Sequence, residues 1–270
     1  VGISNLAPFS KIALSEESYY YKIKFWILGK TIISSSHKAS LVLALSSTAK
    51  DLLINLGVNR GKIFLNPIGV DSFWKEKSNN EDFLNKHNIN KKYFLYVSHF
   101  YRYKNHVRLI KAFSELPSII QNNYNLILIG SPINKSYFDN IKKIIYDLSL
   151  DDKIILIPGL PRNDLRVFYQ NTSLFIFPSL VENCPNILLE AMASQAPVST
   201  VNLNPMKEYC LDSAIYFDGT KIVSIKNAII KFIETSDPQR MKILSSKRSD
   251  DFSWDTFVDN IITKLKSIKL

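Results

Sequence analysis

The stretch LFIFPSLVENCPNILLEAMASQA, residues 174–196, decides the fold of this chain. It opens with the apolar run 174–177, which is too short and too aromatic for a soluble helix and predicts a buried strand. Pro178 ends this run. Residues 187–193 have the composition of a good helix, and a proline at its first turn is the expected start signal. A buried strand, a loop and a helix in this order predict one unit of a parallel α/β sheet.

Glu190 lies on this predicted helix, whose apolar side chains point almost all round the axis. A carboxylate on such a buried helix is costly unless it is hydrogen-bonded, either by a basic neighbour or backbone amide or by a ligand hydroxyl. Glu182 precedes the helix, and the amides of Asn186 and Ile187, expected to be free, lie at its start. The loop between a strand and a helix N-terminus commonly holds phosphate in α/β sheets. A structural ion pair at Glu190 is the alternative.

Glu182 and Glu190 form an E-x7-E pattern that Ala-Met-Ala continues at 191–193. Embedded in FPSLVENCPNILLEAMA, the pattern resembles the signature of family-4 retaining glycosyltransferases of the GT-B fold, and the resemblance extends over nearly the whole chain. It implies an α/β chain with a Rossmann-like, parallel-sheet C-terminal domain and an N-terminal Rossmann-like domain whose first part is missing. The expected divisions are a partial acceptor-side domain (1–74), a linker (75–92), a nucleotide-sugar-binding domain (93–251) and a helix crossing back (252–270).

Charge and composition narrow the function classes. The 270 residues include 34 Lys and Arg against 24 Asp and Glu, a net charge of +10. This balance suits nucleic acid, an anionic membrane surface or a phosphorylated substrate. No zinc-ligand set or RNA-recognition motif accompanies it, so we do not expect nucleic acid to bind. The two cysteines, Cys184 and Cys210, have no metal spacing and indicate a reducing compartment, here the cytoplasm. No apolar run is long enough to span a bilayer.

The first third of the chain predicts a short α/β arrangement. Residues 15–36 read as a helix packed on the N-terminal sheet, and their aromatics mixed with lysines equally suit a helix at an anionic membrane surface. Residues 39–46 and 63–65 are predicted strands, with the helix 48–56 between them. The turn at 66–71 is similar to the family's turn at the end of the N-terminal domain.

The rest of the chain alternates apolar runs with helical segments, which predicts a parallel sheet. The predicted strands are 93–98, 126–130, 154–157, 174–177, 197–201 and 215–218, and the predicted helices between them include 107–116, 137–148 and 164–170.

A basic loop follows the first of these strands, where doubly wound sheets face their ligands. In the family, an Arg directly after this strand and a Lys a few residues later hold the donor diphosphate. Lys104 matches the Lys, whereas His99 occupies the position of the Arg. Two alternatives for the second cation are Arg102 reaching back and a protonated His99. A solvated basic loop is the competing interpretation.

The resemblance assigns further roles. Glu190 would bind the nucleotide ribose and Glu182 the transferred sugar, with Lys104 and Arg102 completing the catalytic set. The loop at Leu160 and Pro161 resembles the family's base-contacting loop. The turn that holds sugar hydroxyls and phosphate would consist of Asn183, Cys184, Pro185, Asn186 and Ile187. Gly130 stands where the backbone passes close to a ligand or turns sharply. Glu208 matches a frequent family glutamate, and a solvated loop position is equally expected for it.

The chain is therefore expected to be a retaining, metal-independent glycosyltransferase that uses a UDP- or GDP-linked sugar. No Asp-x-Asp metal motif is present. The expected acceptor is a glycan or lipid-linked glycan of bacterial surface polysaccharide, such as lipopolysaccharide, at the inner face of the cytoplasmic membrane. The alternative is a nucleotide-sugar-binding fragment or pseudoenzyme without transfer activity. The E-x7-E pattern argues against a relative that cleaves or epimerises nucleotide sugars.

Overall fold

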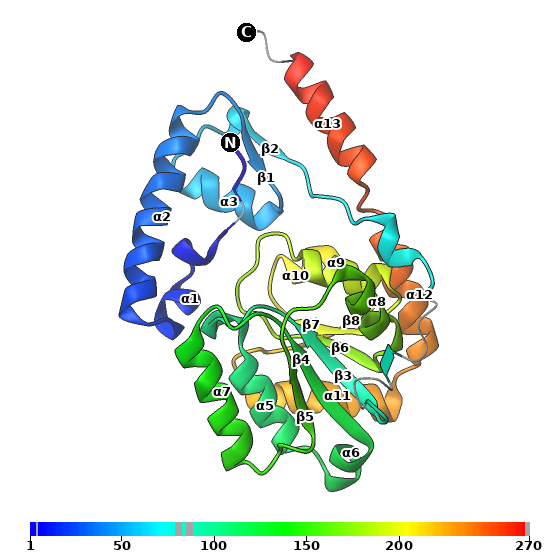
Figure 1. Cartoon of the computed structure of the whole chain (residues 1–270). Coiled ribbons are helices and arrows are strands. Elements are labelled where there is room, and N and C mark those ends of the chain that lie inside the picture. Colours follow the sequence, from blue (N-terminus) through cyan, green and yellow to red (C-terminus); the bar gives the residue numbers. More distant parts are fainter. Residues whose placement is uncertain (4, 79–82, 85–88, 268–270) are drawn as a thin grey trace.

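The computed structural model describes residues 1–3, 5–78, 83–84 and 89–267. Its larger part is a six-stranded, all-parallel sheet with the order β5-β4-β3-β6-β7-β8 (Figure 1). The strands are β3 (Lys92–Val97), β4 (Tyr124–Ile129), β5 (Ile154–Ile157), β6 (Leu174–Phe177), β7 (Val198–Val201) and β8 (Ala214–Phe217). The predicted parallel α/β sheet is confirmed. The strand order reverses between β3 and β6, which is where sheets of this kind bind ligands.

Helices cover both faces of this sheet. α5 (His106–Ser114), α7 (Lys135–Asp147) and α11 (Ile222–Thr235) pack together on one face. α8 (Arg162–Asn171), α9 (Asn186–Ala193), α10 (Met206–Cys210) and α12 (Pro238–Ser249) lie on the other, and α6 (Ser118–Asn123) flanks β4. Because both faces are covered, strands such as β6 are buried at every residue.

The smaller part is built around two short parallel strands, β1 (Val42–Ala44) and β2 (Ile63–Leu65). Gly2 adds a parallel bridge to Leu43, so the first residues extend this sheet. The predicted helix at 15–36 corresponds to α2 (Tyr19–Lys38), whereas its first two residues end a separate helix, α1 (Lys11–Glu16). α3 (Ser47–Asn55) follows β1. The predicted strand at 39–46 is shorter than expected, because only its central residues pair with β2.

Two crossings connect the smaller and larger parts. The first is the turn at 66–71, which leads into the 3-10 helix η3 (Ser72–Lys75), and the second precedes α13 (Trp254–Ser267). The crossings contact each other, since the amide of Val70 donates to the carbonyl of Phe252 at 3.0 Å. The amide side chain of Asn66 bonds to the carbonyl of Phe257 at 2.9 Å. α13 thus contacts the turn at 66–71 through Asn66, while the helix crossing back at 252–270 stays a prediction.

Of the predicted linker at 75–92, residues 79–82 and 85–88 lie outside the described residues. Residues 268–270 of the predicted final helix do too. No helix in the described part of the chain is both long enough and apolar enough to pass through a bilayer.

Candidate active site

The loops that follow β3 and β6 meet at the point where the strand order reverses. The first loop contains the 3-10 helix η4 (Arg102–Lys104), and the second leads to the start of α9. The backbone after β4 approaches the first loop closely: a Cβ at Gly130 would lie 1.9 Å from the carbonyl oxygen of Ser98. Glycine is therefore required at position 130 for the loops to pack. The close approach is made to the backbone of Ser98, whereas the sequence predicts an approach to a ligand or a sharp turn.

The structure pairs Lys104 with Glu182. The Lys104 Nζ lies 2.5 Å from the Glu182 Oε1, and the two side chains are only 15% and 12% exposed. The backbone of Lys104 is fixed by the sheet, because the hydroxyl of the buried Tyr96 in β3 donates to the Lys104 carbonyl at 2.8 Å. Two of the predicted catalytic residues thus lie in direct contact, one from each loop.

Arg102 and His99 lie apart from this pair. The Arg102 guanidinium lies 5.4 Å from the ring centre of Tyr137, and the Arg102 amide donates to the Glu17 carboxylate at 3.0 Å. The Arg102 side chain lines a separate cavity of about 270 Å³. His99 is exposed on the basic loop. The cation that contacts Glu182 is therefore Lys104.

Glu190 faces a cavity of about 230 Å³ between α9, the turn at 66–71 and the start of α13. The Tyr169 hydroxyl donates to its carboxylate at 3.3 Å. Within the described residues, no Lys or Arg lies within ion-pair distance of Glu190, because the nearby Arg162 pairs with Asp71 at 2.7 Å. The structural ion pair is thus not the arrangement seen, and the carboxylate retains the capacity to accept further hydrogen bonds.

Burial controls the protonation of Glu190. It raises the pKa of this carboxyl from the ordinary 4.5 to about 7, against the opposing effects of the Tyr169 hydrogen bond and the Arg162 charge. A perturbed carboxyl that lines a cavity is a typical feature of a ligand site.

The turn before α9 is partly committed to internal contacts. Asn183 is buried, and its side chain bonds to the carbonyl of Ile3 and the hydroxyl of Ser46. Burial raises the pKa of the Cys184 thiol to about 11, so this cysteine is not a thiolate. The Asn186 amide is not free as expected, because the tight turn directs it to the carbonyl of Cys184 at 2.9 Å. Asn186 itself is exposed and lines the Glu190 cavity.

Pro185 and Ile187 complete this turn. Pro185 is the N-cap of α9, and its carbonyl accepts from the amides of Leu188 and Leu189. Ile187 is half-buried. The two residues thus form the first turn of the helix that carries Glu190.

Leu160 and Pro161 follow β5 and lead directly into α8. Pro161 is the N-cap of α8, and the next residue, Arg162, lines the Glu190 cavity. The Arg162 guanidinium lies 5.2 Å from the ring centre of Trp74, which also lines the cavity. The sequence pattern alone predicts neither Arg162 nor Trp74 as a site residue. The position of Arg162 directly after the predicted base-contacting loop was the available signal.

Glu208 is not a solvated loop residue. Its two carboxylate oxygens each accept from the amide of Ser47 at 3.0 Å, and the Ser47 hydroxyl also donates to it. Ser47 begins α3 in the smaller part of the molecule. Glu208 therefore joins the two parts.

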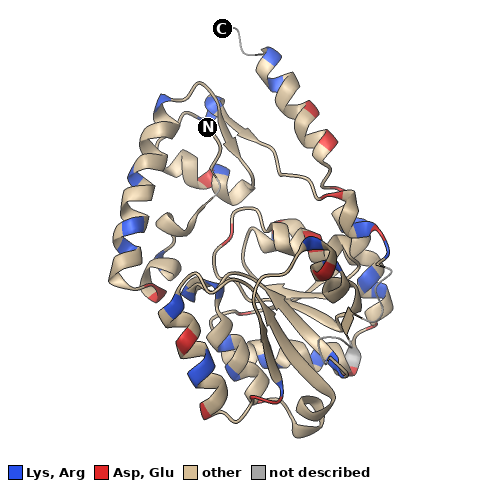
Figure 2. Ribbon diagram, in the orientation of Figure 1, with Lys and Arg blue, Asp and Glu red and all other residues tan. Residues whose placement is uncertain are grey.

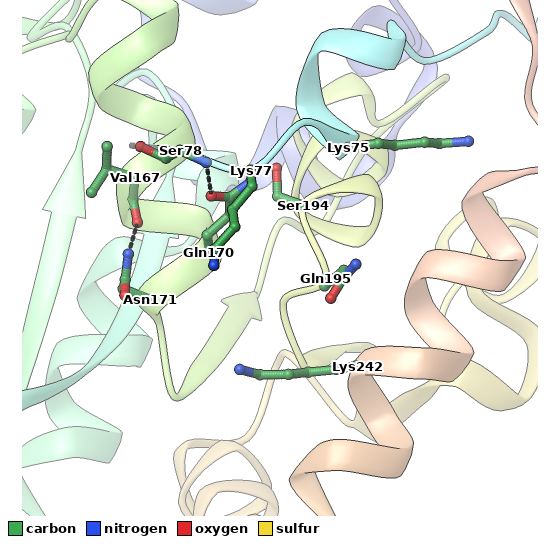
Figure 3. Close-up of a pocket in the computed structure, with 9 residues that line it drawn as sticks. All are labelled: Lys75, Lys77, Ser78, Val167, Gln170, Asn171, Ser194, Gln195 and Lys242. Carbon is green, nitrogen blue, oxygen red and sulfur yellow. Dashed lines mark hydrogen bonds between the residues drawn. The ribbon is translucent and has the colours of Figure 1, made fainter. Parts of the chain in front are cut away.

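Two further cavities lie near the loop that carries Glu182 and near the end of α9. One of about 190 Å³ lies in front of Glu182, between residues of both parts. Another, of about 350 Å³, lies between α8, α9 and α12, with Lys75, Lys77 and Lys242 around it (Figure 3). None of the predicted site residues lines this larger cavity. Among the described residues, no group of three His, Cys, Asp or Glu side chains is arranged to hold a metal ion.

Comparison with known proteins places these features in a family. The chain is 25% identical over 216 residues to the O-antigen chain mannosyltransferase RfbU of Salmonella typhimurium, covering 79% of this chain and 56% of that protein. It is 23% identical over 256 residues to the O-antigen chain mannosyltransferase B of Escherichia coli, covering 92% and 66%. The chain thus spans between about half and two thirds of these relatives' lengths.

Solved structures show the same fold. HepE of Anabaena, in complex with UDP and glucose, matches with a TM-score of 0.79 at 19% identity, over 88% of this chain and 66% of that one. Sucrose-phosphate synthase of Thermosynechococcus elongatus matches with a TM-score of 0.79 at 18% identity, over 98% and 66%. The predicted GT-B fold is confirmed. The family described as glycosyl transferases group 1 matches residues 78–249, and the chain belongs to this family.

Proposed function

We propose that this chain moves a sugar from a nucleotide-sugar donor to a glycan or lipid-linked glycan acceptor in the assembly of a bacterial surface polysaccharide. The observation that carries the proposal is the position of Glu190: a carboxylate without a cationic partner among the described residues, facing a cavity at the start of α9, the helix that follows the loop after β6. Membership of the glycosyl transferases group 1 family and the O-antigen mannosyltransferases among the relatives support it.

The donor's nucleoside would occupy the Glu190 cavity. A carboxylate suits a ribose diol because its oxygens accept from both hydroxyls. Trp74 and Trp254 line the same cavity, and the predicted base-contacting loop at Leu160 and Pro161 leads into it through Arg162. The base is therefore proposed to lie near Arg162. The nucleotide of the donor is proposed to be UDP or GDP, and UDP is the nucleotide bound in the HepE structure.

The donor's diphosphate would lie against the basic loop and the start of α9. Departure of the nucleotide leaves negative charge on the diphosphate, and a fixed cation with a helix N-terminus stabilises that charge. Lys104, which contacts Glu182 in the loop before α9, would be this cation. His99 or Arg102 would become the second cation after a side-chain movement. These groups supply the positive charge in the proposed transfer, which uses no metal ion.

The proposed transfer retains the anomeric configuration, as the family does. The acceptor hydroxyl would attack the anomeric carbon from the face that the diphosphate leaves, so the new C–O bond forms as the bond to the diphosphate breaks. The acceptor proton passes to an oxygen of the departing phosphate. Glu182 would contact the sugar at this face, and no covalent enzyme intermediate is required.

The acceptor would enter the cavity of about 190 Å³ in front of Glu182. Both parts of the molecule supply its walls. Its apolar side chains suit the ring faces of a sugar, and its polar groups suit the hydroxyls. The lining residues are Leu6, Phe9, Ser10, Thr48, Leu52, Leu180, Val181, Glu182 and Asn204.

We also propose that α2 touches an anionic membrane surface, where a lipid-linked acceptor would be found. The helix lies at the outer edge of the molecule (Figure 1) and carries lysines along its length (Figure 2). Tyr19, Tyr20 and Trp26 are 79%, 63% and 65% exposed. An exposed face that mixes aromatic rings with lysines fits the boundary of an anionic bilayer. The side packed on the rest of the protein holds Phe25 and Gly29.

The experiment that tests the proposal is a thermal-shift screen of the chain against a panel of UDP-, GDP- and other nucleotide-linked sugars. We expect one nucleotide class to raise the melting temperature. Release of the nucleotide from that donor is then measured with and without candidate glycan acceptors. Donor binding without turnover would favour the alternative, a nucleotide-sugar-binding protein without transfer activity, whereas no binding at all would contradict the proposal.

A further inference from the structure

The turn between β1 and α3, residues 45–47, is held by three side chains from the larger part of the molecule. The Tyr209 hydroxyl donates to the Leu45 carbonyl at 2.6 Å. The Ser46 hydroxyl donates to the Asn183 side-chain oxygen at 3.1 Å. The amide and hydroxyl of Ser47 both donate to Glu208. Three successive residues of one part are thus fixed by the other.

Glu208 makes the charged contact of this set. Its carboxylate lies at the N-terminus of α3, a helix of nine residues, where the aligned peptide dipoles favour negative charge. Hydrogen bonds to an ionised acceptor are roughly twice as strong as neutral ones. The backbone of α10 (Met206–Cys210) is held as well, because the Arg248 guanidinium donates to the carbonyls of Glu208 and Tyr209, both at 2.8 Å. Glu208 therefore projects from a held helix.

Asn183 connects the same turn to the reacting groups. It directly follows Glu182, whose carboxylate contacts Lys104. The Ser46 hydroxyl that donates to Asn183 also accepts from the Ala49 amide at 3.1 Å, as the N-cap of α3. The start of α3 and the loop carrying Glu182 are therefore fixed relative to each other through one buried serine.

These contacts adjoin the cavity in front of Glu182, because Ser47 directly precedes Thr48 and Asn183 directly follows Glu182, and both Thr48 and Glu182 line it. Thr48 and Leu52 of α3 form one side of it, while Glu182 and Asn204 form another. The covalent crossings at 66–71 and before α13 join the two parts through a different set of residues. Side-chain contacts at α10, rather than the chain itself, thus fix this wall of the cavity.

We propose that Glu208 is a positioning residue: it holds the start of α3 against the larger part and so sets the spacing of the cavity between α3 and Glu182. Asn183 assists it through Ser46. The catalytic consequence rests on the proposed function, because it assumes that an acceptor enters this cavity. The structural consequence does not depend on that assumption.

Hydrogen exchange tests the structural consequence without any ligand. Glu208→Ala removes the acceptor of the Ser47 amide, so peptides covering Ser47 and Thr48 should exchange about tenfold faster, while those of β6 keep their protection. Glu208→Gln, which retains an acceptor, should lie between this variant and the wild type. Glu115→Ala removes an exposed carboxylate that pairs with Lys226 at 3.2 Å and is the control. Unchanged exchange at Ser47 in Glu208→Ala would overturn the proposal.

Kinetics test the catalytic consequence. With the nucleotide sugar that the screen selects, Glu208→Ala should lower kcat by about tenfold and leave donor KM within about twofold of the wild type. A matching loss of nucleotide affinity in Glu208→Ala and Glu208→Gln, or lost β6 protection in both, would show a general structural role and overturn the proposal. If no nucleotide binds the wild type, the proposed function fails, while the exchange result still decides the role of Glu208 at α3.

Discussion

The ammonium of Lys104 and the carboxylate of Glu182 lie 2.5 Å apart, although 77 residues separate them in the sequence. Each neutralises the other where little water reaches, which avoids the cost of an unpaired, largely buried charge. A donor diphosphate arriving at this place would compete with Glu182 for Lys104. Glu182 would then be released toward the sugar, which is the role proposed for it.

Substitution of Lys104 and substitution of Glu182 should affect nucleotide affinity differently. Lys104→Met removes the cation and should weaken binding of the preferred nucleoside diphosphate at least about tenfold, because a charge-assisted contact to phosphate is lost. Glu182→Gln frees Lys104 and should leave this affinity unchanged or increased. Calorimetry measures both. An equal loss of nucleotide affinity in the two variants would show that the ion pair stabilises the loops and that Lys104 does not bind the phosphate.

The raised pKa of Glu190 predicts a cost in stability. Because the folded pKa is about 7 against an ordinary 4.5, the folded protein binds more protons than the unfolded chain between these values. Stability is therefore lost as pH rises through this range, and the loss is complete above about pH 7. Glu190→Gln should raise the free energy of unfolding at pH 8 by on the order of 1–3 kcal/mol, and by much less at pH 4.5. Urea unfolding at both pH values checks this.

The same protonation should affect donor binding. Below about pH 7 a protonated Glu190 accepts fewer hydrogen bonds, so affinity for the preferred nucleotide sugar should fall as the pH drops from 8 to 6. The control is Glu190→Gln, which should bind the nucleotide sugar more weakly and should not show this fall in affinity between pH 8 and pH 6. A pH profile that is identical in the two proteins would assign the dependence to another group.

The exposed face of α2 predicts binding to lipid. Vesicles that contain an anionic phospholipid should retain the wild-type chain in a sedimentation assay, and Trp26→Ser with Tyr20→Ser should release it, because aromatic area at the interface is lost. Tyr146→Ser, which replaces an aromatic 74% exposed on α7, is the control. Failure of the wild-type protein to sediment with the vesicles would contradict the proposed contact between α2 and the membrane. The exposed face of α2 would then be free to bind another protein.

Gly130 should tolerate no side chain. A Cβ there would lie 1.9 Å from the Ser98 carbonyl oxygen, a backbone atom that cannot rotate away. Gly130→Ala should therefore separate the loops after β3 and β4 and lower the free energy of unfolding by about 3 kcal/mol or more. Gly2→Ala, where an added Cβ lies 4.0 Å from the Cδ2 of Leu43, is the control. Chemical denaturation distinguishes the two variants.

Local pattern was enough to predict β6, α9 and the parallel sheet, since short apolar runs between helical segments have few alternative folds. α11 is absent from the predicted helices, although its buried residues Ile225, Ala228, Ile229 and Phe232 have the i, i+3, i+4, i+7 spacing of an amphipathic helix. The domain boundaries remain predictions.

The site was predictable only where a motif marked it. Arg162, Trp74 and Trp254 reach the Glu190 cavity from three distant segments, so only the tertiary fold brings them together. Contacts across the molecule, such as Glu208 with Ser47, likewise have no local signal. The direction of the Arg102 side chain also depends on a neighbour from another helix, Tyr137.

The most direct test of the account is a calorimetric titration of UDP and of GDP into the wild-type chain, Glu190→Ala and the control Glu115→Ala. We predict that the wild type and the control bind one of the two nucleotides with equal affinity, and that Glu190→Ala binds it at least about tenfold more weakly. Unchanged affinity in Glu190→Ala would contradict the central claim that this carboxylate holds the donor.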